Sequence, residues 1–297
     1  MNFENLLVKY FGEEVFFDYP LKNFSSYSLG GKAKYLAIPN TINTLNRLTN
    51  LCQDFAIDFK IIGNGSNILF GDKGYGGLII TTKKLKKLSV IDNKVTALLG
   101  NNLTELINYS KSNGLSGLEG LISIPATIGG AVYQNASAFN YNVSDKIYSV
   151  TALDNGKLKK YFNADCKFSY RKSVFQKNKE IILEASFILE KKDQKEIEKE
   201  IKNFIEKRKK SQPKEKSCGS VFKNGKDYFS AKLIDQAGLK GYKIGGATVS
   251  NVHANFITVE KGATASNVYA LIEHVKKIVK EKFNVSLTLE VELVGEF

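Results

Sequence analysis

Two glycine-rich stretches carry residue types that could hold a phosphorylated ligand with a flat ring. The first, Gly63-Asn-Gly-Ser-Asn67, combines glycines, a hydroxyl and amides, which supply the main-chain donors and the tolerance of positive φ that a pyrophosphate nest requires. The second runs from Gly117 to Ala138 and is almost uncharged. Its small side chains would let the backbone approach a ring and bond its edge. A tight turn between strands is the alternative for each stretch.

The second stretch is also unusual in its number of residues that interrupt helices and strands. Pro125 and the pair Gly129-Gly130 interrupt it too often for a regular helix or strand to fill it. A buried backbone without regular structure still has to pair its amides and carbonyls. We therefore expect these groups to bond either a ligand or neighbouring loops.

Few other residues could do demanding chemistry. The chain has only two histidines, His253 and His274, and three widely spaced cysteines without a Cys-x-x-Cys pair. A disulfide framework, a zinc site and a multi-histidine metal centre are therefore not expected. The chemistry would have to use an organic cofactor or ordinary side chains.

The formal net charge of +13 indicates either an anionic partner or a lysine-rich solvated surface. Arginine occurs only at positions 47, 171 and 208, whereas proteins that read nucleic acids rely on arginine. The composition thus favours a polyanionic small ligand. No apolar run reaches the roughly 18 residues of a membrane span, and Met1 to Asn5 lack the character of a secretory signal, so we expect a cytoplasmic protein.

The elements around the two stretches follow from hydrophobic periodicity and turn residues. A helix beginning at Thr41 lies between strands at 35–38 and 59–62, which is a βαβ arrangement. No helix follows Asn67, which argues against a Rossmann fingerprint or a Walker loop. Asn155-Gly156 predicts a hairpin of strands 147–153 and 158–162. Further helices are expected at 4–11, 102–113, 193–210, 231–237 and 268–279, and further strands at 78–81, 88–90, 95–99, 181–189, 255–259 and 286–294, the last with Thr288, Glu290 and Glu292 on one face.

Taken together, four segments resemble the family of UDP-N-acetylenolpyruvoylglucosamine reductases, flavoenzymes that make UDP-N-acetylmuramate for peptidoglycan. Their order and spacing match over nearly the whole chain. The four segments are Gly63 to Asn67, Ile124 to Ala136, Ser169 to Arg171 and Gly219 to Asn224. The matching positions continue with Gly238 to Tyr242, His253 to Phe256 and Glu290, whereas Ala126, Ser137, Cys218, Gly225 and Glu292 depart from the family pattern.

The resemblance implies an α+β fold. An FAD-binding domain of the vanillyl-alcohol-oxidase type, with two α+β subdomains, would occupy residues 1–205, its lobes roughly 1–85 and 86–205. An α+β substrate-binding domain would follow at 206–297, in the shorter form of the family. The first glycine loop would hold the pyrophosphate of FAD, and the second stretch would contact flavin and adenine. The implied cofactor-binding residues are Gly63, Asn64, Gly65, Ser66, Asn67, Ile68, Ile124, Pro125, Ala126, Gly129, Gly130, Gln134 and Asn135.

The resemblance also implies a reaction, in which NADPH reduces FAD and a hydride then passes to the β-carbon of an enolpyruvyl ether. Arg171 would stabilise the charge that builds on the substrate carboxylate, because a guanidinium presents a fixed fork. Ser220 would protonate the α-carbon, and a protonated Glu290 would donate toward the carboxylate. A salt bridge and a backbone cap are the structural alternatives for Arg171 and Ser220. The implied substrate-binding residues are Tyr170, Lys223, Asn224 and His253, with a structural role as the alternative for His253.

Two other functions stay open at this level. Another FAD oxidoreductase of the same fold would have a different substrate domain, without Arg171, Ser220 and Glu290 in these motifs. A basic nucleic-acid-binding protein would be colourless and would bind DNA in a salt-sensitive manner. The resemblance favours an NADPH-dependent flavin enzyme of peptidoglycan precursor synthesis that is monomeric, binds a UDP-sugar, and has no metal, nucleic-acid or membrane partner.

Overall fold

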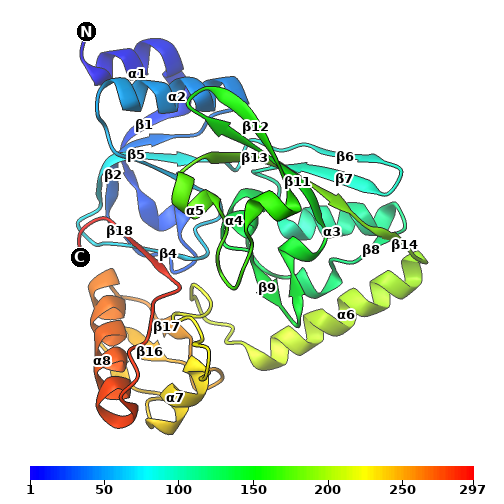
Figure 1. Cartoon of the computed structure of the whole chain (residues 1–297). Helices are drawn as coiled ribbons and strands as arrows, with labels where there is room; N and C mark the ends of the chain where they lie inside the picture. The colour runs from blue at the N-terminus through cyan, green and yellow to red at the C-terminus, as the bar shows by residue number, and fades with distance from the viewer. The chain divides into compact units, whose positions relative to one another are not determined.

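The chain forms two compact units, each assembled from separate segments, in a computed structural model that describes residues 1–297 (Figure 1). The chain passes between the units for the last time after Arg208, close to the boundary expected at 205. The observed division nevertheless differs from the expected contiguous one, because residues 17–35 and 65–77 belong with the C-terminal part. The first unit comprises Met1–Phe16, Leu36–Asn64 and Leu78–Arg208, and the second comprises Phe17–Tyr35, Gly65–Gly77 and Lys209–Phe297.

The βαβ arrangement near the N-terminus is confirmed. Helix α2 (Ile42–Asp54) begins where the Thr41 hydroxyl accepts the N–H of Thr44 at 3.0 Å, and its apolar face is buried. It joins β2 (Lys32–Ala37) to β3 (Phe59–Ile62), and β3 pairs in parallel with β5 (Tyr75–Thr81). The sheet has the order β1-β2-β5-β3, with β1 at Val15–Pro20, and α1 spans Phe3–Phe11.

A five-stranded antiparallel sheet forms the larger part of the first unit. Alternate residues of its strands pack into one apolar core with α3 (Leu103–Ser112), α4 (Ile128–Tyr133) and α6 (Gln194–Ser211). The expected hairpin is confirmed, because Asn155 and Gly156 both have positive φ and Asp154 pairs with Lys157. The strand order is β12 (Lys157–Phe162), β11 (Ile147–Asp154), β13 (Ile181–Ile188), β7 (Lys94–Leu98) and β6 (Leu88–Ile91).

Helix α3 (Leu103–Ser112) begins at a residue that caps it. The Glu105 carboxylate accepts the N–H of Asn102 at 3.0 Å, so α3 starts with a capping box. The helices are α3 (Leu103–Ser112), α4 (Ile128–Tyr133), α5 (Phe175–Asn178) and α6 (Gln194–Ser211), and the short elements are η1 (Gly12–Glu14), β8 (Leu115–Ser116), η3 (Glu119–Leu121), β9 (Ser137–Ala138), β10 (Tyr141–Asn142), η4 (Val143–Asp145), η5 (Asn163–Cys166) and β14 (Glu190–Lys191).

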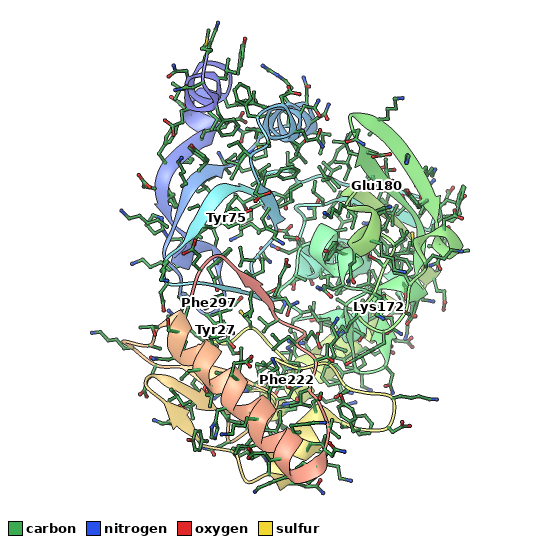
Figure 2. The ribbon with its side chains drawn as sticks, turned by 60° about the vertical axis from the view of Figure 1, so that its left-hand side comes forward. Tyr27, Tyr75, Lys172, Glu180, Phe222 and Phe297 are labelled. Carbon is green, nitrogen blue, oxygen red and sulfur yellow. The ribbon has the colours of Figure 1, made fainter.

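The second unit packs α7 and α8 around its own core, which includes the buried side chains of Tyr27 and Phe222 (Figure 2). Helix α8 is long and amphipathic, as expected. The Asp72 carboxylate accepts the N–H groups of Ala265 and Ser266, each at 2.8 Å, at the start of this helix. The elements are η2 (Leu21–Phe24), β4 (Ile68–Phe70), α7 (Ser230–Gln236), β15 (Lys243–Ile244), β16 (Ala247–Val249), β17 (Ile257–Val259), α8 (Ala265–Phe283) and β18 (Glu292–Val294).

The last segment corrects one expectation. Residues 286–294 do not form one continuous strand, because only Glu292–Val294 are extended as β18, in parallel with β4. The N–H groups of Glu290 and Val291 both point to the carbonyl of Val221, at 2.8 and 3.4 Å, as in a β-bulge. This irregularity breaks the alternation that would have placed three polar residues on one face.

Candidate active site

The first glycine loop has main-chain donors that the protein itself does not use. None of the main-chain N–H groups from Gly63 to Asn67 donates to an acceptor within the protein. Gly65 has a φ of 64°, and a Cβ there would overlap the carbonyl of Phe24, so only glycine fits. A short run of such N–H groups around a left-handed residue is the geometry of an anion-binding nest. The loop therefore fits a pyrophosphate.

Asn64 connects this loop with the second glycine-rich stretch. Its Nδ2 donates to Asn102 Oδ1 at 2.8 Å and to the carbonyl of Pro125 at 3.1 Å. Gly63 packs so closely against Thr127 that a Cβ would overlap the threonine hydroxyl. Gly63 and Asn64, at the start of the first stretch, thus lie against the second stretch within the first unit.

The second stretch is more regular than expected. Residues Ile128–Tyr133 form the helix α4, so the expectation that no helix fits here is wrong for this part. The N–H groups of Ile128 and Gly129 donate to the carbonyls of Asn101 and Leu99, at 2.8 and 3.0 Å. A Cβ on Gly129 would lie only 3.2 Å from that of Leu99, so glycine lets the helix pack against the end of β7. These amides serve the protein and leave no donors for a ring edge.

Gly130 differs from its neighbour. A Cβ built there would meet only the Thr127 hydroxyl, at 3.6 Å, so there is open space beside it. The stretch can therefore still present small side chains to a flat ring, although the N–H groups of Ile128 and Gly129 bond within the protein.

Arg171 lies on a tight turn in the first unit. Ser169 and Lys172 exchange two main-chain hydrogen bonds of 3.1 Å, and Arg171 between them has a left-handed φ of 53°. Its Nη1 donates to the Ser137 hydroxyl at 2.8 Å, and its guanidinium carbon lies 5.4 Å from the centre of the Tyr170 ring. Ser137, a departure from the family pattern, thus gives the guanidinium a partner, and the guanidinium has a defined direction.

Two predicted cofactor-binding residues are connected to this turn. Asn135 bonds it directly, and Gln134 is connected to it through Gln176. Asn135 is 6% exposed, and its Nδ2 donates to the carbonyl of Ser169 at 3.1 Å while its Oδ1 accepts the N–H of Ser144 at 3.1 Å. Gln176 donates to the carbonyl of Arg171 at 3.1 Å and to Gln134 Oε1 at 3.3 Å. Gln176 was not predicted, although a polar residue five positions after an expected catalytic arginine is a usable signal.

Ser220 and Glu290 lie on neighbouring strand segments of the second unit. Ser220 bridges Phe256 in antiparallel fashion, and the next residue, Val221, accepts the N–H of Glu290 at 2.8 Å. The position of Glu290 is also fixed from another side, because Asn67 Nδ2 donates to its carbonyl at 2.9 Å. The side chain of Asn67, predicted to bind cofactor, therefore holds a predicted catalytic segment.

The predicted substrate-binding residues are distributed over both units. Tyr170 is exposed next to Arg171, whereas the others belong to the second unit. Asn224 accepts the N–H of Ser230 at 3.0 Å, and Lys223 donates its main-chain N–H to Thr288 at 2.9 Å. Burial lowers the pKa of His253, and its Nδ1 accepts the N–H of Asn255 at 3.2 Å, so the neutral ring carries its proton on Nε2.

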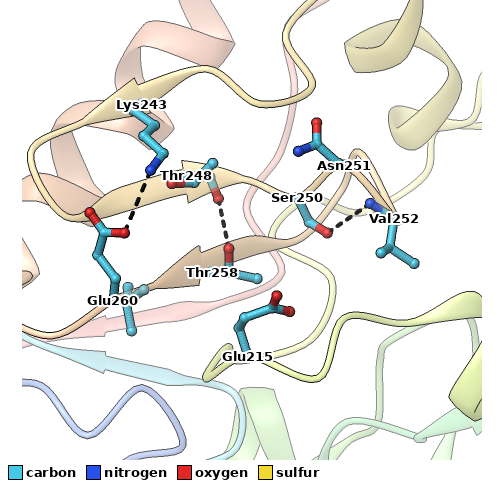
Figure 3. A pocket seen from close by; sticks show the side chains of 9 residues that line it. Glu215, Lys243, Thr248, Ser250, Asn251, Val252, Thr258 and Glu260 are labelled. Atoms are coloured by element: carbon cyan, nitrogen blue, oxygen red, sulfur yellow. Dashed lines mark hydrogen bonds and ion pairs between the residues drawn. The ribbon is translucent and has the colours of Figure 1, made fainter.

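A hollow of about 250 Å³ lies on β15 to β17 (Figure 3). It contains none of the predicted site residues, and several of its polar groups bond one another. Lys243 pairs with Glu260 at 3.5 Å, and the Thr258 hydroxyl bonds the carbonyl of Thr248 at 3.4 Å.

Metal and thiol chemistry find no support in the side-chain arrangement. No group of three His, Cys, Asp or Glu side chains is placed to hold a metal ion. Burial raises the pKa of Cys52, Cys166 and Cys218 to about 12, so these thiols stay protonated at neutral pH. No helix combines the length and apolar character needed to cross a membrane.

Comparisons with known families agree with the two-part organisation. Residues 212–294 match the model of the C-terminal domain of UDP-N-acetylenolpyruvoylglucosamine reductase, and residues 33–160 match an FAD binding domain. The UDP-N-acetylenolpyruvoylglucosamine reductases of Carboxydothermus hydrogenoformans and Clostridium novyi are 42% and 41% identical to this chain. These alignments cover 98% and 96% of this chain and 97% and 93% of the two relatives.

Solved structures give the same result. The crystal structure of UDP-N-acetylenolpyruvylglucosamine reductase from Thermus caldophilus has a TM-score of 0.81 at 32% identity, over 95% of this chain and 98% of that one. Alkyldihydroxyacetonephosphate synthase, at 16% identity and a TM-score of 0.50 over 64% of this chain and 40% of that one, shares the fold alone. The expected α+β fold with an FAD-binding domain is confirmed. The chain belongs to the UDP-N-acetylenolpyruvoylglucosamine reductase family, the FAD-dependent oxidoreductases of peptidoglycan precursor synthesis.

Proposed function

We propose that this protein uses NADPH to reduce UDP-N-acetylglucosamine-enolpyruvate to UDP-N-acetylmuramate. The observation that carries the proposal is the 2.8 Å hydrogen bond from Glu290 N to Val221 O, which places the segments of Ser220 and Glu290 side by side in one unit. An acid for protonation and a carboxyl group then lie on adjacent, main-chain-bonded segments. FAD, when bound, supplies hydride transfer from NADPH to the vinyl group.

The glycine loop is proposed to hold the pyrophosphate of FAD through its main-chain N–H groups. These groups have no protein acceptor from Gly63 to Asn67, and Ile68 follows them at the start of β4. The second stretch would lie against the ring system, where Gly130 has open space beside it. Ile124, Pro125 and Ala126 precede α4 and would contribute small or apolar surface there.

Arg171 is proposed to bind the substrate carboxylate. Reduction of the enolpyruvyl group builds negative charge on that carboxylate, and a charge fixed in advance stabilises it without reorganisation. The Arg171 guanidinium is already oriented by Ser137 and Tyr170. Its planar fork can form two parallel bonds to a carboxylate.

Ser220 is proposed to complete the reduction. The hydride adds to the β-carbon of the vinyl group, and the Ser220 hydroxyl gives its proton to the α-carbon, so the carbon–carbon double bond becomes a single bond. A solvent proton restores the hydroxyl, and NADPH is the only reductant consumed. Glu290, in its protonated form, donates a hydrogen bond toward the carboxylate and supports Arg171.

The remaining residues would bind the rest of the substrate. Lys223 and Asn224 lie three and four residues after Ser220 in the chain, and His253 presents an Nε2–H donor. The lysine-rich composition suits a protein whose ligands FAD, NADPH and a UDP-sugar are all polyanions. We propose that the protein works in the cytoplasm as a monomer, where NADPH and nucleotide sugars are available.

One experiment tests the whole proposal. The purified protein should be yellow, and NADPH under anaerobic conditions should bleach the flavin absorbance. Addition of UDP-N-acetylglucosamine-enolpyruvate should then restore the oxidised spectrum with formation of one UDP-N-acetylmuramate per flavin. A colourless protein, or a reduced flavin that the substrate leaves reduced, would contradict the proposal.

A further inference from the structure

A single buried amide, that of Asn255, bonds both main-chain polar groups of Phe222. Asn255 Oδ1 accepts the N–H of Phe222 at 3.0 Å, and its Nδ2 donates to the Phe222 carbonyl at 2.8 Å. Both residues are nearly inaccessible, at 4% and 2% exposure, and Phe222 belongs to the core of the second unit (Figure 2). The side chain of Asn255 therefore replaces a strand partner for this residue.

The main chain of Asn255 extends the same contact. Its carbonyl accepts the N–H of Val221 at 2.8 Å, while the carbonyl of Val221 accepts the N–H of Glu290 at 2.8 Å. The pair Val221 and Phe222 is thus bonded on one side by Asn255 and on the other by the segment of Glu290. The two residues after Ser220 form their main-chain hydrogen bonds with Asn255 and with the segment of Glu290. Leu289, in the segment of Glu290, bridges Phe222.

The residue before Ser220 gives no such support. Gly219 has a φ of 73°, and a Cβ built on it would have no neighbour within 4 Å. Ser220 itself bridges Phe256, the residue after Asn255, so the direction of its side chain depends on this bridge and on the contacts that follow it in the chain. Asn255 itself is held in turn, because His253 Nδ1 accepts its N–H at 3.2 Å.

We propose that Asn255 is the positioning residue for the proton donor Ser220, an inference that rests on the proposed function. Asn255 does not act on the substrate, because both ends of its amide are used by Phe222 and its side chain is buried. It acts by holding the strand that carries Ser220 at a fixed distance from the segment of Glu290. The expected signature is a loss confined to the step in which the α-carbon is protonated.

The physical reason is the cost of leaving polar main-chain groups buried without partners. Asn255→Leu keeps the approximate volume but removes both bonds to Phe222, and the strand relaxes to recover partners for these groups. A displacement of the reacting group by about 1 Å costs about 100-fold in rate. Flavin reduction by NADPH does not use Ser220 and should change less than about threefold.

The test uses the full-length protein loaded with FAD and follows each half-reaction by anaerobic stopped-flow absorbance. The variants are Asn255→Leu, Ser220→Ala and the double substitution. Asn255→Asp keeps the acceptor for Phe222 N and replaces the donor with a carboxyl oxygen, which can bond the Phe222 carbonyl only when it is protonated. The matched control is Asn267→Ala, because Asn267 Oδ1 accepts the N–H groups of Gly246 and Thr264, each at 3.2 Å, in the same unit.

The inference predicts that Asn255→Leu slows reoxidation by substrate about 100-fold and leaves flavin reduction nearly unchanged. In the Ser220→Ala background the same substitution should cost less than about threefold more, because the group it positions is already absent. Asn255→Asp should show a smaller loss in the same step, and Asn267→Ala should show none, whatever its thermal midpoint.

Equal losses in both half-reactions, or fully multiplicative losses in the double variant, would overturn the inference and leave the proposed function standing. If Asn255→Leu fails to fold, Asn255→Asp decides by the same two criteria. Ser220→Ala with unchanged reoxidation would remove the proposed role of Ser220 and the inference with it. A wild-type protein that substrate cannot reoxidise would instead refute the proposed function itself.

Discussion

The turn of Arg171 and the strand segments of Ser220 and Glu290 are positioned by different means. The turn belongs to the first unit, and side chains hold it: Asn135 and Gln176 bond its carbonyls. The strand segments belong to the second unit, and mostly main-chain hydrogen bonds hold them. The side-chain amides of Asn67 and Asn255 add further hydrogen bonds to their main chain. A side-chain substitution can therefore release the turn, whereas the strands should tolerate all but these amide substitutions.

The difference also separates two kinds of catalytic demand. Arg171 has to meet a carboxylate, and its long side chain can adjust to the ligand around a fixed anchor. Ser220 has a short side chain and must reach one carbon atom, so its backbone has to be placed closely. Main-chain hydrogen bonds hold the segment of Ser220, whose side chain is short. Side chains anchor the turn of Arg171, whose side chain is long. Each arrangement matches the demand on its residue.

The largest effect is expected from removal of the guanidinium. Arg171→Met keeps much of the apolar stem but loses the charge that stabilises the developing carboxylate anion, so reoxidation by substrate should fall about 1,000-fold. Flavin reduction by NADPH should change much less. Stopped-flow rates of the two half-reactions measure this, and equal losses in both would show that Arg171 serves the fold or the cofactor and not the substrate.

A smaller effect is expected from substitution of Glu290, the proposed hydrogen-bond donor to the substrate carboxylate. Glu290→Gln keeps the main-chain bond to Val221 and the size of the side chain but removes the carboxyl proton, so reoxidation should slow about 100-fold. NADPH-driven bleaching should stay nearly intact. If bleaching slows as much as reoxidation, the role assigned to Glu290 is wrong.

The anchor of the turn should matter next. Asn135→Ala removes the bonds to Ser169 and Ser144, which should lower the unfolding free energy by about 1–3 kcal/mol and slow reoxidation about tenfold by loosening Arg171. Asn163→Ala is the matched control, since Asn163 Nδ2 bonds the carbonyls of Ser144 and Ile147 at 2.7 and 2.9 Å. Urea unfolding and stopped-flow rates should show a stability loss in both variants but a rate loss only in the first.

The smallest effect is expected from Asp72, which bonds the start of helix α8 in the second unit. Burial alone would raise the pKa of Asp72, but the hydroxyl and N–H of Ser266 and the N–H of Ala265 outweigh it and hold that pKa below its ordinary value. Asp72→Asn should destabilise the protein by at most about 1 kcal/mol, because the carboxylate is largely exposed. Its half-reaction rates should equal those of the wild type.

The difference in unfolding free energy between the wild type and Asp72→Asn should depend on pH with a defined sign. A lowered pKa in the folded state means that Asp72 stabilises the protein fully above its unfolded pKa of about 3.9 and loses this contribution as the pH falls through the lower folded value. The gap in unfolding free energy between wild type and Asp72→Asn should therefore be widest near neutral pH and close in acid. A gap that widens as the pH falls would contradict the assignment.

Local chemistry made much of the fold predictable. The Thr41 cap, the apolar face of α2 and the Asn155-Gly156 turn act within a few residues, and the helix and the hairpin that they predict are present. The bulge at Glu290 and Val291 could not be foreseen, because it depends on Val221, far away in the chain. The discontinuous units have the same cause, since residues 17–35 and 65–77 join the C-terminal segment through long-range packing.

How several of the predicted site residues are bonded within the protein could not be foreseen from the sequence. Gly63 to Asn67 could be identified because glycines and small polar residues cluster there. The amide side chains of Asn64, Asn67 and Asn135 bond main-chain carbonyls of other segments, which no local pattern reveals. Asn255 was expected at the start of a strand, whereas the observed strand begins at Ile257 and the Asn255 side chain bonds Phe222. The roles of the predicted site residues stay predictions.

The most direct test of the account is the ratio of the two half-reaction rates in Ser220→Ala. If Ser220 is the proton donor, NADPH should reduce the flavin of this variant at close to the wild-type rate, while the enolpyruvyl substrate should reoxidise it at least about 100-fold more slowly. Reoxidation at the wild-type rate would show that the α-carbon receives its proton from another group, and would contradict the central claim that these paired segments of the second unit carry the protonation step.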